Sequence, residues 1–151
     1  MLKLHRKLIK SQRSVSVAES CTGGLLSKLL TDHSGSSQYF ILGVVCYSNK
    51  AKKSILKVPD RLIRKNGAVS EPVAVNLAQN IRKLAKTDFG IGITGIAGPT
   101  GGTPAKPVGT VFIAIASKTK TTCRRLHFKG RRNSIRKQSA LKALSLLKGQ
   151  L

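Results

Sequence analysis

Apolar and polar residues follow two different periods along the chain. In several stretches apolar residues recur at helical spacing, which predicts helices over residues 2–12, 25–32, 49–56, 59–65, 70–84 and 130–148. Shorter runs rich in β-branched residues predict strands over residues 14–18, 39–47, 88–94, 109–116 and 122–128. The run from Tyr39 to Tyr47 is almost wholly apolar, which predicts a central strand buried on both faces.

The order of these elements predicts the fold class. Helices alternate with strands early in the chain, and two strands follow one another late. This order is typical of a three-layer α/β/α sandwich with a mixed sheet of about five strands. A length of 151 residues with 40% hydrophobic content suits one domain over residues 1–151. No run has membrane-spanning length and the N-terminus lacks an apolar signal core, so we expect a cytoplasmic protein without membrane contact.

The charge balance narrows the choice of partners. The 28 Lys and Arg against five Asp and Glu give a formal net charge of +23, which ordinarily indicates a nucleic acid or another anionic partner. The basic residues are spread along the whole chain, and only two tyrosines and four phenylalanines are available for stacking on bases. We therefore expect weak, nonspecific polyanion binding and attraction of a small anionic substrate. Three cysteines without CxxC spacing and three scattered histidines indicate neither a metal site nor a Ser-His-Asp triad, and no cofactor is implied.

Candidate chemistry begins where the first strand ends. Residues 19–22 (Glu-Ser-Cys-Thr) follow the strand and precede Gly23 and Gly24, after which a helix begins. Open α/β sheets bind ligands at the carboxyl ends of their strands, and a helix N-terminus offers free N–H groups. The same stretch also suits a plain helix cap made by Ser20 or Thr22, and alone it favours neither interpretation.

A second candidate is the glycine-rich loop over residues 95–103. Residues 90–95 match the G-x-G-x-x-G pattern, but two of these glycines fall inside a strand and Pro99 stands where a helix should start. We therefore reject a dinucleotide fingerprint. The loop keeps free N–H groups that suit a phosphate or a ribose, although an ordinary long turn explains it equally well.

Five motifs occur together and in order. They are AESCTGG at 18–24, YSN-x-x-K at 47–52, GAVS at 67–70, TGIAGP-x-GG at 94–102 and KPVGT at 106–110. From about Ser14 to the last helix the chain closely resembles the CinA C-terminal domain family, the nicotinamide-nucleotide amidohydrolases (NMN deamidases). The resemblance implies hydrolysis of nicotinamide mononucleotide to nicotinic acid mononucleotide and ammonia, a step of pyridine nucleotide salvage. Larger family members carry an additional N-terminal domain, so the chain resembles the stand-alone form.

The resemblance also implies catalytic residues. By matched position, Ser20 is the nucleophile and Lys52 is the base, while Tyr47 and Thr94 complete a polar cluster. Amide hydrolysis needs a nucleophile and a base. Because the chain offers no usable histidine, a serine paired with a lysine is also the plausible arrangement on chemical grounds. Lysine acts as a base only when its pKa is lowered, and we expect burial and the cations of Lys50, Lys53 and Lys57 to lower it.

Several alternatives remain open at this point. Lys52 also suits a solvated helix position in a lysine-rich stretch, and Tyr47 suits a core aromatic. Cys21 is a rival nucleophile, although small buried cysteines are common. Ser37 also matches a family position and would serve as nucleophile or phosphate ligand.

The last predicted helix begins with an arginine cluster. Residues 128–136 (FKGRRNSIR) resemble the family's Phe-x-Gly-Asp-Arg-x-x-Val-Arg, with Arg132 and Arg136 on the family's arginines and Arg131 in place of its aspartate. Cations at a helix N-terminus oppose its dipole, and a substrate phosphate would balance them. The expected substrate-binding residues are Glu19, Gly23, Gly24, Ser37, Asn49, Gly95, Gly98, Lys106, Arg132 and Arg136. The competing function is a non-catalytic nucleic-acid- or polyanion-binding domain, and the apolar strands permit a homodimer.

Overall fold

The computed structural model describes residues 2–151, and its helices and strands alternate as the sequence predicts. The elements are α1 (Leu2–Ser11), β1 (Val15–Glu19), α2 (Leu25–Thr31), η1 (Ser36–Gln38), β2 (Phe40–Val45), α3 (Asn49–Ser54), α4 (Asp60–Asn66), α5 (Glu71–Ala85), β3 (Phe89–Gly95), β4 (Thr110–Ala116), β5 (Thr121–His127) and α6 (Arg132–Lys148). None of the helices within residues 2–151 is both long and apolar enough to cross a bilayer.

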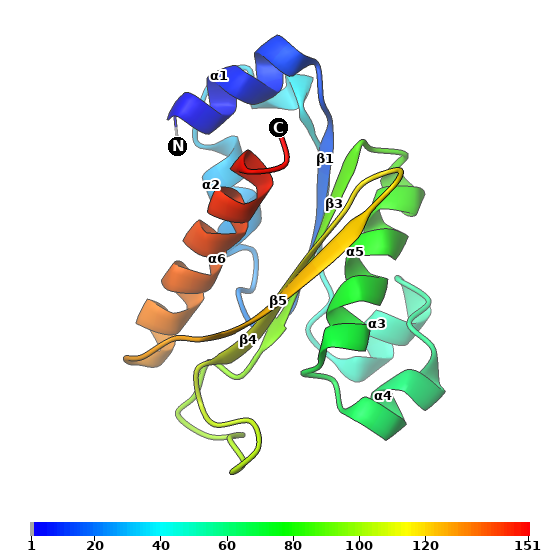
Figure 1. Ribbon diagram of the computed structural model, residues 1–151, viewed down its shortest axis with the longest axis vertical. Coiled ribbons are helices and arrows are strands. Elements are labelled where there is room, and N and C mark those ends of the chain that lie inside the picture. Colours follow the sequence, from blue (N-terminus) through cyan, green and yellow to red (C-terminus); the bar gives the residue numbers. More distant parts are fainter. Residues whose placement is uncertain (1) are drawn as a thin grey trace.

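The strands form one mixed, five-stranded sheet in the order β2-β1-β3-β4-β5. Strand β1 pairs in parallel with β2 and β3, whereas β3–β4 and β4–β5 are antiparallel. Helices α1, α2 and α6 lie on one side of this sheet, and α3, α4 and α5 lie on the other (Figure 1). The prediction of a three-layer α/β/α sandwich is therefore confirmed.

The centre of the sheet is apolar on both faces. All residues of β1 and β4 are buried, because helices cover both sides of these strands. Gly90 and Gly92 lie within β3, where a Cβ atom would overlap the backbone carbonyl oxygens of Ala78 and Ala74 in α5. These glycines therefore allow α5 to pack closely on the sheet, which agrees with the rejection of a dinucleotide fingerprint.

Strand β2 differs from its prediction. It lies at the edge of the sheet and its residues alternate between half-buried and exposed, so the prediction of a central, doubly buried strand is wrong. Leu42 and Val44 pack against the core on the α5 side, whereas Ile41 and Val45 are 52% and 49% exposed. An apolar run reports hydrophobicity and not the position of a strand in the sheet.

Candidate active site

The parallel strands bring one polar pocket together at their carboxyl ends. It has a volume of about 320 Å³ and lies beyond the ends of β1, β2 and β3. All four predicted catalytic residues line it, as do Asn49, Gly95, Gly98 and Arg132 from the predicted substrate-binding set.

The side chains of Ser20 and Lys52 meet inside this pocket. The Nζ atom of Lys52 lies 3.0 Å from Ser20 Oγ, and it also donates to the carbonyl oxygens of Cys46 at 3.0 Å and Tyr47 at 2.9 Å. Lys52 is only 2% exposed, so it is not a solvated helix residue. Burial removes water from the amine and lowers the pKa of Lys52 below its ordinary value.

Burial, and not a group of cations, is the main cause of this lowered pKa. The side chains of Lys50, Lys53 and Lys57 belong to exposed residues, and Lys53 pairs with Asp60 at 2.8 Å. Solvent and this ion pair screen the lysines from the pocket, which corrects the expectation that neighbouring lysines lower the pKa of Lys52.

The position of Lys52 follows from the turn between β2 and α3. The backbone N–H of Cys46 donates to the carbonyl oxygen of Glu19 at 2.9 Å, which ties the end of β2 to the end of β1. Ser48 then caps α3, because its side chain accepts from the N–H of Ala51 at 3.0 Å. Lys52 therefore lies in α3 with its side chain directed back to the carbonyl oxygen of Tyr47 and to Ser20.

Cys21 lines the same pocket but is poorly suited to attack. It is 6% exposed, and burial raises the pKa of its thiol to about 12. The thiolate is the nucleophilic form of cysteine, so Cys21 is unreactive near neutral pH. The geometry therefore favours Ser20, whose hydroxyl lies against a buried amine.

Glu19 caps a helix and does not face the pocket. Its buried carboxylate accepts from the N–H groups of Gly24 and Leu26 through Oε2, and from the N–H and hydroxyl groups of Ser27 through Oε1. Gly23 and Gly24 adopt φ values of 59° and 94°, and these left-handed conformations turn the chain into α2. The prediction that these three residues bind substrate is therefore corrected: they shape the turn that holds Ser20.

Replacing Glu19 by glutamine should destabilise the fold. One side-chain oxygen becomes an NH₂ group that cannot accept, so buried donors at the start of α2 lose their partner. We expect the free energy of unfolding to fall by about 2–4 kcal/mol. Urea denaturation of Glu19→Gln measures this loss, and Glu71→Gln, on an exposed first-turn acid of α5, is the matched control. Equal stability of both variants would contradict the capping role.

Arg132 joins two walls of the pocket. Its Nη1 atom donates to the carbonyl oxygen of Gly98 at 2.8 Å, and its Nη2 atom donates to the hydroxyl of Tyr47 at 2.9 Å. These two contacts orient the guanidinium group at the pocket mouth although Arg131 replaces the family's aspartate. Tyr47 is 57% exposed, so it is not a core aromatic.

Thr94 holds a third wall. Its hydroxyl donates to the carbonyl oxygen of Ala68 at 2.8 Å, and the residue is buried. This bond fixes the loop over residues 67–70, from which Ala68 and Val69 line the pocket. The sequence motif at 67–70 pointed to this loop without assigning it a role, and Val69 and Ile96 supply apolar lining that sequence reasoning missed.

Two other predicted residues, Arg136 and Lys106, lie outside the pocket lining. Arg136 donates twice to the carbonyl oxygen of Thr22, at 3.2 Å and 2.8 Å, and Lys106 donates to that of Asn66 at 2.7 Å. Both side chains thus support backbone around the site, and direct binding of substrate by them stays a prediction.

Ser37 lies at the opposite end of the sheet from the pocket of its own chain. It precedes β2, whose first residue Phe40 pairs with Val15 at the start of β1, whereas Ser20 follows the end of β1. The strand between them spans about 15 Å. Ser37 is therefore not the nucleophile of this pocket.

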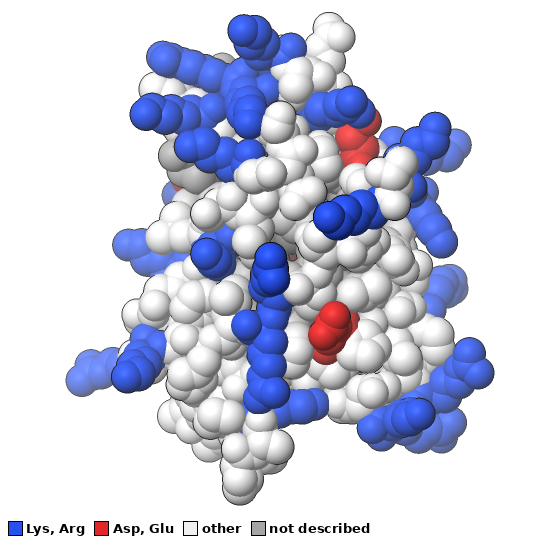
Figure 2. All heavy atoms as spheres, viewed as in Figure 1, with Lys and Arg blue, Asp and Glu red and all other residues white. Residues whose placement is uncertain are grey.

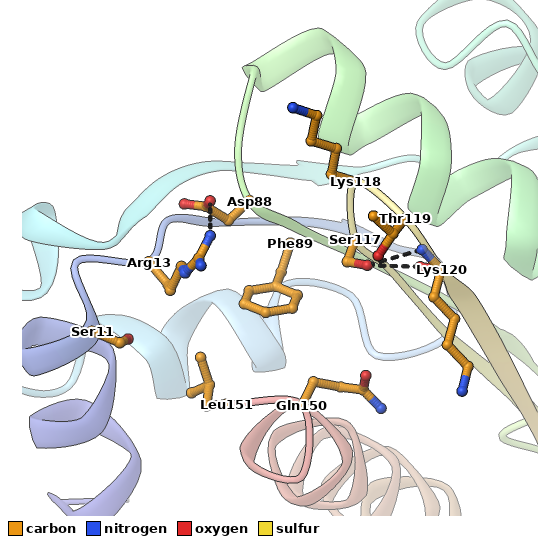
Figure 3. Close-up of a pocket in the computed structure, with 10 residues that line it drawn as sticks. All are labelled: Ser11, Arg13, Asp88, Phe89, Ser117, Lys118, Thr119, Lys120, Gln150 and Leu151. Atoms are coloured by element: carbon orange, nitrogen blue, oxygen red, sulfur yellow. Dashed lines mark hydrogen bonds and ion pairs between the residues drawn. The ribbon is translucent and has the colours of Figure 1, made fainter.

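A larger hollow than this pocket lies elsewhere in the molecule. It measures about 690 Å³ and lies beside the start of β3 and the turn between β4 and β5. Phe89, the Arg13–Asp88 ion pair and Leu151 line it (Figure 3). This hollow contains none of the predicted site residues. The side chains that line a pocket therefore identify the candidate site better than the volume of the pocket does. Across residues 2–151, no three His, Cys, Asp or Glu side chains gather closely enough to hold a metal ion.

The protein is therefore a three-layer α/β/α domain with a polar pocket at the carboxyl ends of its parallel strands. The family model of the CinA C-terminal domain matches residues 1–151, and the chain belongs to this family.

Relatives and solved structures agree with this assignment. The chain is 49% identical over 145 residues to a CinA-like protein of Syntrophus aciditrophicus, covering 95% of this chain and 34% of that protein. A CinA-like protein of Thermotoga neapolitana is 49% identical over 146 residues, with 97% and 36% covered. The chain thus spans about a third of the length of these curated relatives.

Solved structures match over nearly their whole length. The CinA superfamily protein of Escherichia coli has a TM-score of 0.94 at 34% identity and covers 99% of this chain and 87% of that one. The competence/damage inducible protein of Agrobacterium tumefaciens has a TM-score of 0.93 at 35% identity, with 97% and 93% covered. The resemblance stated from the motifs and the fold class are therefore confirmed.

Proposed function

We propose that the protein hydrolyses the carboxamide of nicotinamide mononucleotide, giving nicotinic acid mononucleotide and ammonia. The observation that carries this proposal is the 3.0 Å contact between Lys52 Nζ and Ser20 Oγ in a pocket at the carboxyl ends of the strands. Membership of the CinA family supports the choice of substrate, which the motif resemblance implies.

The contacts of Lys52 suit a general base. A neutral amine has two N–H bonds and one lone pair. The carbonyl oxygens of Cys46 and Tyr47 accept the two N–H bonds, which leaves the lone pair for the hydroxyl proton of Ser20. Burial lowers the pKa of Lys52 and so favours the neutral amine, and the orientation of this amine fits proton abstraction.

The reaction then follows in two halves. Lys52 takes the Ser20 proton while Oγ attacks the carboxamide carbon, and the resulting lysine ammonium returns a proton to the nitrogen that leaves as ammonia. This gives an ester between Ser20 and the pyridine carboxyl group. Water, deprotonated by Lys52, attacks the ester carbon, and the proton returns to Ser20 Oγ as nicotinic acid mononucleotide leaves.

Arg132 is the group best placed to bind the substrate phosphate. It lies at the pocket mouth, and a guanidinium group can bind phosphate through paired hydrogen bonds. Val69 and Ile96 offer apolar surface within the same pocket for a pyridine ring. Under this proposal the anionic end of the substrate lies near Arg132 and its amide near Ser20.

Removing the Arg132 charge should weaken binding more than chemistry. For Arg132→Ala we expect KM to rise about tenfold to a hundredfold, with a smaller fall in kcat. Arg131→Ala, at the adjacent exposed arginine, is the matched control and should change KM little. Steady-state ammonia release measures both constants, and a large change in kcat alone would contradict phosphate binding by Arg132.

The competing proposal is polyanion binding, which the net charge of +23 favours. Figure 2 shows Lys and Arg side chains scattered over the visible face from one end to the other, without a single concentrated patch. The two functions separate in one experiment: ammonia release from nicotinamide mononucleotide, measured beside DNA retention at increasing salt. Ammonia release with weak, salt-sensitive retention supports the hydrolase. Tight DNA retention without ammonia release supports the binder.

A further inference from the structure

We propose that the protein has a second binding site, and that this site takes a nucleotide. The site is the hollow lined by Phe89, Arg13, Gln150 and the turn over residues 117–120, which we call the distal hollow (Figure 3). Phe89 pairs with Val15 at the start of β1, whereas Ser20 follows the end of β1. The distal hollow and the candidate active site therefore lie at opposite ends of the sheet, and the inference does not rest on the proposed function.

The distal hollow is large enough for a whole nucleotide. Its volume is about 690 Å³, against about 320 Å³ for the candidate active site. Pockets that bind organic ligands commonly measure roughly 300–1,000 Å³. A single inorganic anion would leave most of the distal hollow unfilled, so its size favours a ligand with several parts.

The rim of the distal hollow is cationic. Arg13, Lys118 and Lys120 line it together with one carboxylate, that of Asp88. The carboxylate is occupied, because Oδ1 accepts from Arg13 Nη1 at 2.8 Å and Oδ2 accepts from the N–H and the hydroxyl of Ser14, both at 2.9 Å. Lys118 and Lys120 take part in none of the ion pairs formed within residues 2–151. Three cations against one occupied carboxylate favour an anionic ligand.

The turn that carries the two lysines is held in a fixed shape. The N–H of Ser117 donates to the carbonyl oxygen of Lys120 at 2.7 Å, and the N–H of Lys120 donates to Ser117 Oγ at 3.1 Å. The N–H groups of Lys118 and Thr119 form no backbone hydrogen bond within residues 2–151. A fixed turn with two ammonium groups and two free N–H groups suits a phosphate.

The floor of the distal hollow is aromatic. Figure 3 shows the ring of Phe89 extending from β3 toward Gln150 and Leu151. Phe89 is 7% exposed and packs in the main core, so its position is fixed and one part of the ring faces the hollow. A nucleotide base can lie against this apolar surface, whereas an inorganic phosphate cannot use it.

The remaining lining supplies hydrogen-bonding groups. Ser11 offers a hydroxyl and Gln150 offers an amide, and both suit the hydroxyl groups of a ribose. An aromatic floor, neutral polar groups and a cationic rim thus correspond to the base, the ribose and the phosphate of a nucleotide. In this arrangement the base lies against Phe89 and the phosphate lies at the turn, near Lys120.

A second cationic hollow separates a nucleotide from a longer polyanion. It measures about 390 Å³, borders the same turn, and includes Arg82 and Lys83 of α5 in its lining. A polynucleotide passing over the turn would use both hollows, whereas a single nucleotide uses the distal hollow alone. The dipole of α5 accounts for Arg82 and Lys83, which lie in its last turn, but it does not account for the lysines of the β4–β5 turn. These lysines therefore favour the nucleotide.

Calorimetric titration tests the ligand class. With AMP, ribose 5-phosphate and inorganic phosphate as probes at about 0.15 M salt, AMP should bind the wild type at least about fivefold more tightly than either of the others. Equal affinities for AMP and ribose 5-phosphate would show that no base is bound, and they would overturn the proposal.

Charge reversal tests the location. Lys120→Glu should weaken AMP binding by at least about tenfold. Lys83→Glu, the same change at an exposed residue of the second hollow, is the matched control and should alter the AMP affinity less than about twofold. Circular dichroism checks that both variants fold. Unchanged AMP affinity in Lys120→Glu would contradict the proposal. An equal loss in both variants, with tighter binding of a short single-stranded oligonucleotide than of AMP, would assign the turn to polynucleotides.

The candidate active site must be separated from the distal hollow, because Arg132 there can also attract a phosphate. In an Arg132→Ala background AMP should still bind with a stoichiometry of about one, and adding Lys120→Glu should remove this binding. Loss of AMP binding in Arg132→Ala alone would place the nucleotide in the candidate active site and overturn the inference. If the wild type releases no ammonia from nicotinamide mononucleotide, the proposed function fails, while the AMP titrations still decide the distal hollow.

Discussion

Ser20→Ala should abolish hydrolysis while leaving the fold intact. The attacking oxygen is lost and no other hydroxyl replaces it beside Lys52 Nζ, so we expect ammonia release to fall by at least about a thousandfold. The substitution removes one small oxygen atom, so the thermal unfolding temperature should change little. Continuous ammonia detection and a thermal melt measure the two effects.

The rival nucleophile provides the control for this result. Cys21 lies next to Ser20, but burial raises the pKa of its thiol to about 12. Cys21→Ala should therefore keep its activity within about tenfold of the wild type. Loss of activity in Cys21→Ala together with an active Ser20→Ala would transfer the nucleophilic role to the cysteine.

Lys52→Met should lower the rate about as strongly as Ser20→Ala, and it should also remove a pH dependence. Because only the neutral amine accepts a proton, the wild-type rate should rise with pH through the lowered pKa of Lys52. Lys52→Met has a similar length and no titrating group, so its residual rate should lack this rise. A pH–rate profile of both proteins gives the comparison. An unchanged rise in Lys52→Met would assign the pH dependence to another group.

The same lowered pKa makes the stability of the folded protein depend on pH. In the unfolded chain Lys52 keeps its ordinary pKa of 10.5, whereas in the folded protein its pKa is lower. Between these values the unfolded state binds more protons, so the stability of the folded state rises with pH. The free energy of unfolding of the wild type, measured relative to Lys52→Met, should therefore increase as pH rises through this window. A fall across the window would contradict the lowered pKa.

The sequence predicts the fold class and the central pair of this site well. Strand ends marked by AESCTGG and YSN-x-x-K place Ser20 and Lys52 at one edge of the sheet, because parallel strands share their carboxyl ends. The choice of these two residues came from the family resemblance, because the first strand end alone suited a helix cap equally well and Lys52 suited a solvated helix position.

Other features depend on long-range packing and were predicted wrongly. Strand order decides that β2 is an edge, and an apolar run does not report strand order. Glu19 stands among polar residues like a ligand-binding group, yet the turn at Gly23 and Gly24 directs its carboxylate to the N–H groups of α2. Ser37 is separated from the pocket of its own chain by the length of β1, which only the register of β1 and β2 reveals.

The central claim is that Ser20 forms a covalent ester during turnover, and mass spectrometry of rapidly quenched enzyme tests it most directly. Mixing with nicotinamide mononucleotide and quenching in acid should give a protein adduct of substrate mass less ammonia. Peptide mapping should place this adduct on Ser20, and the Ser20→Ala and Lys52→Met variants should lack it. An adduct of the same mass on Cys21, or steady turnover by Ser20→Ala, would contradict the account.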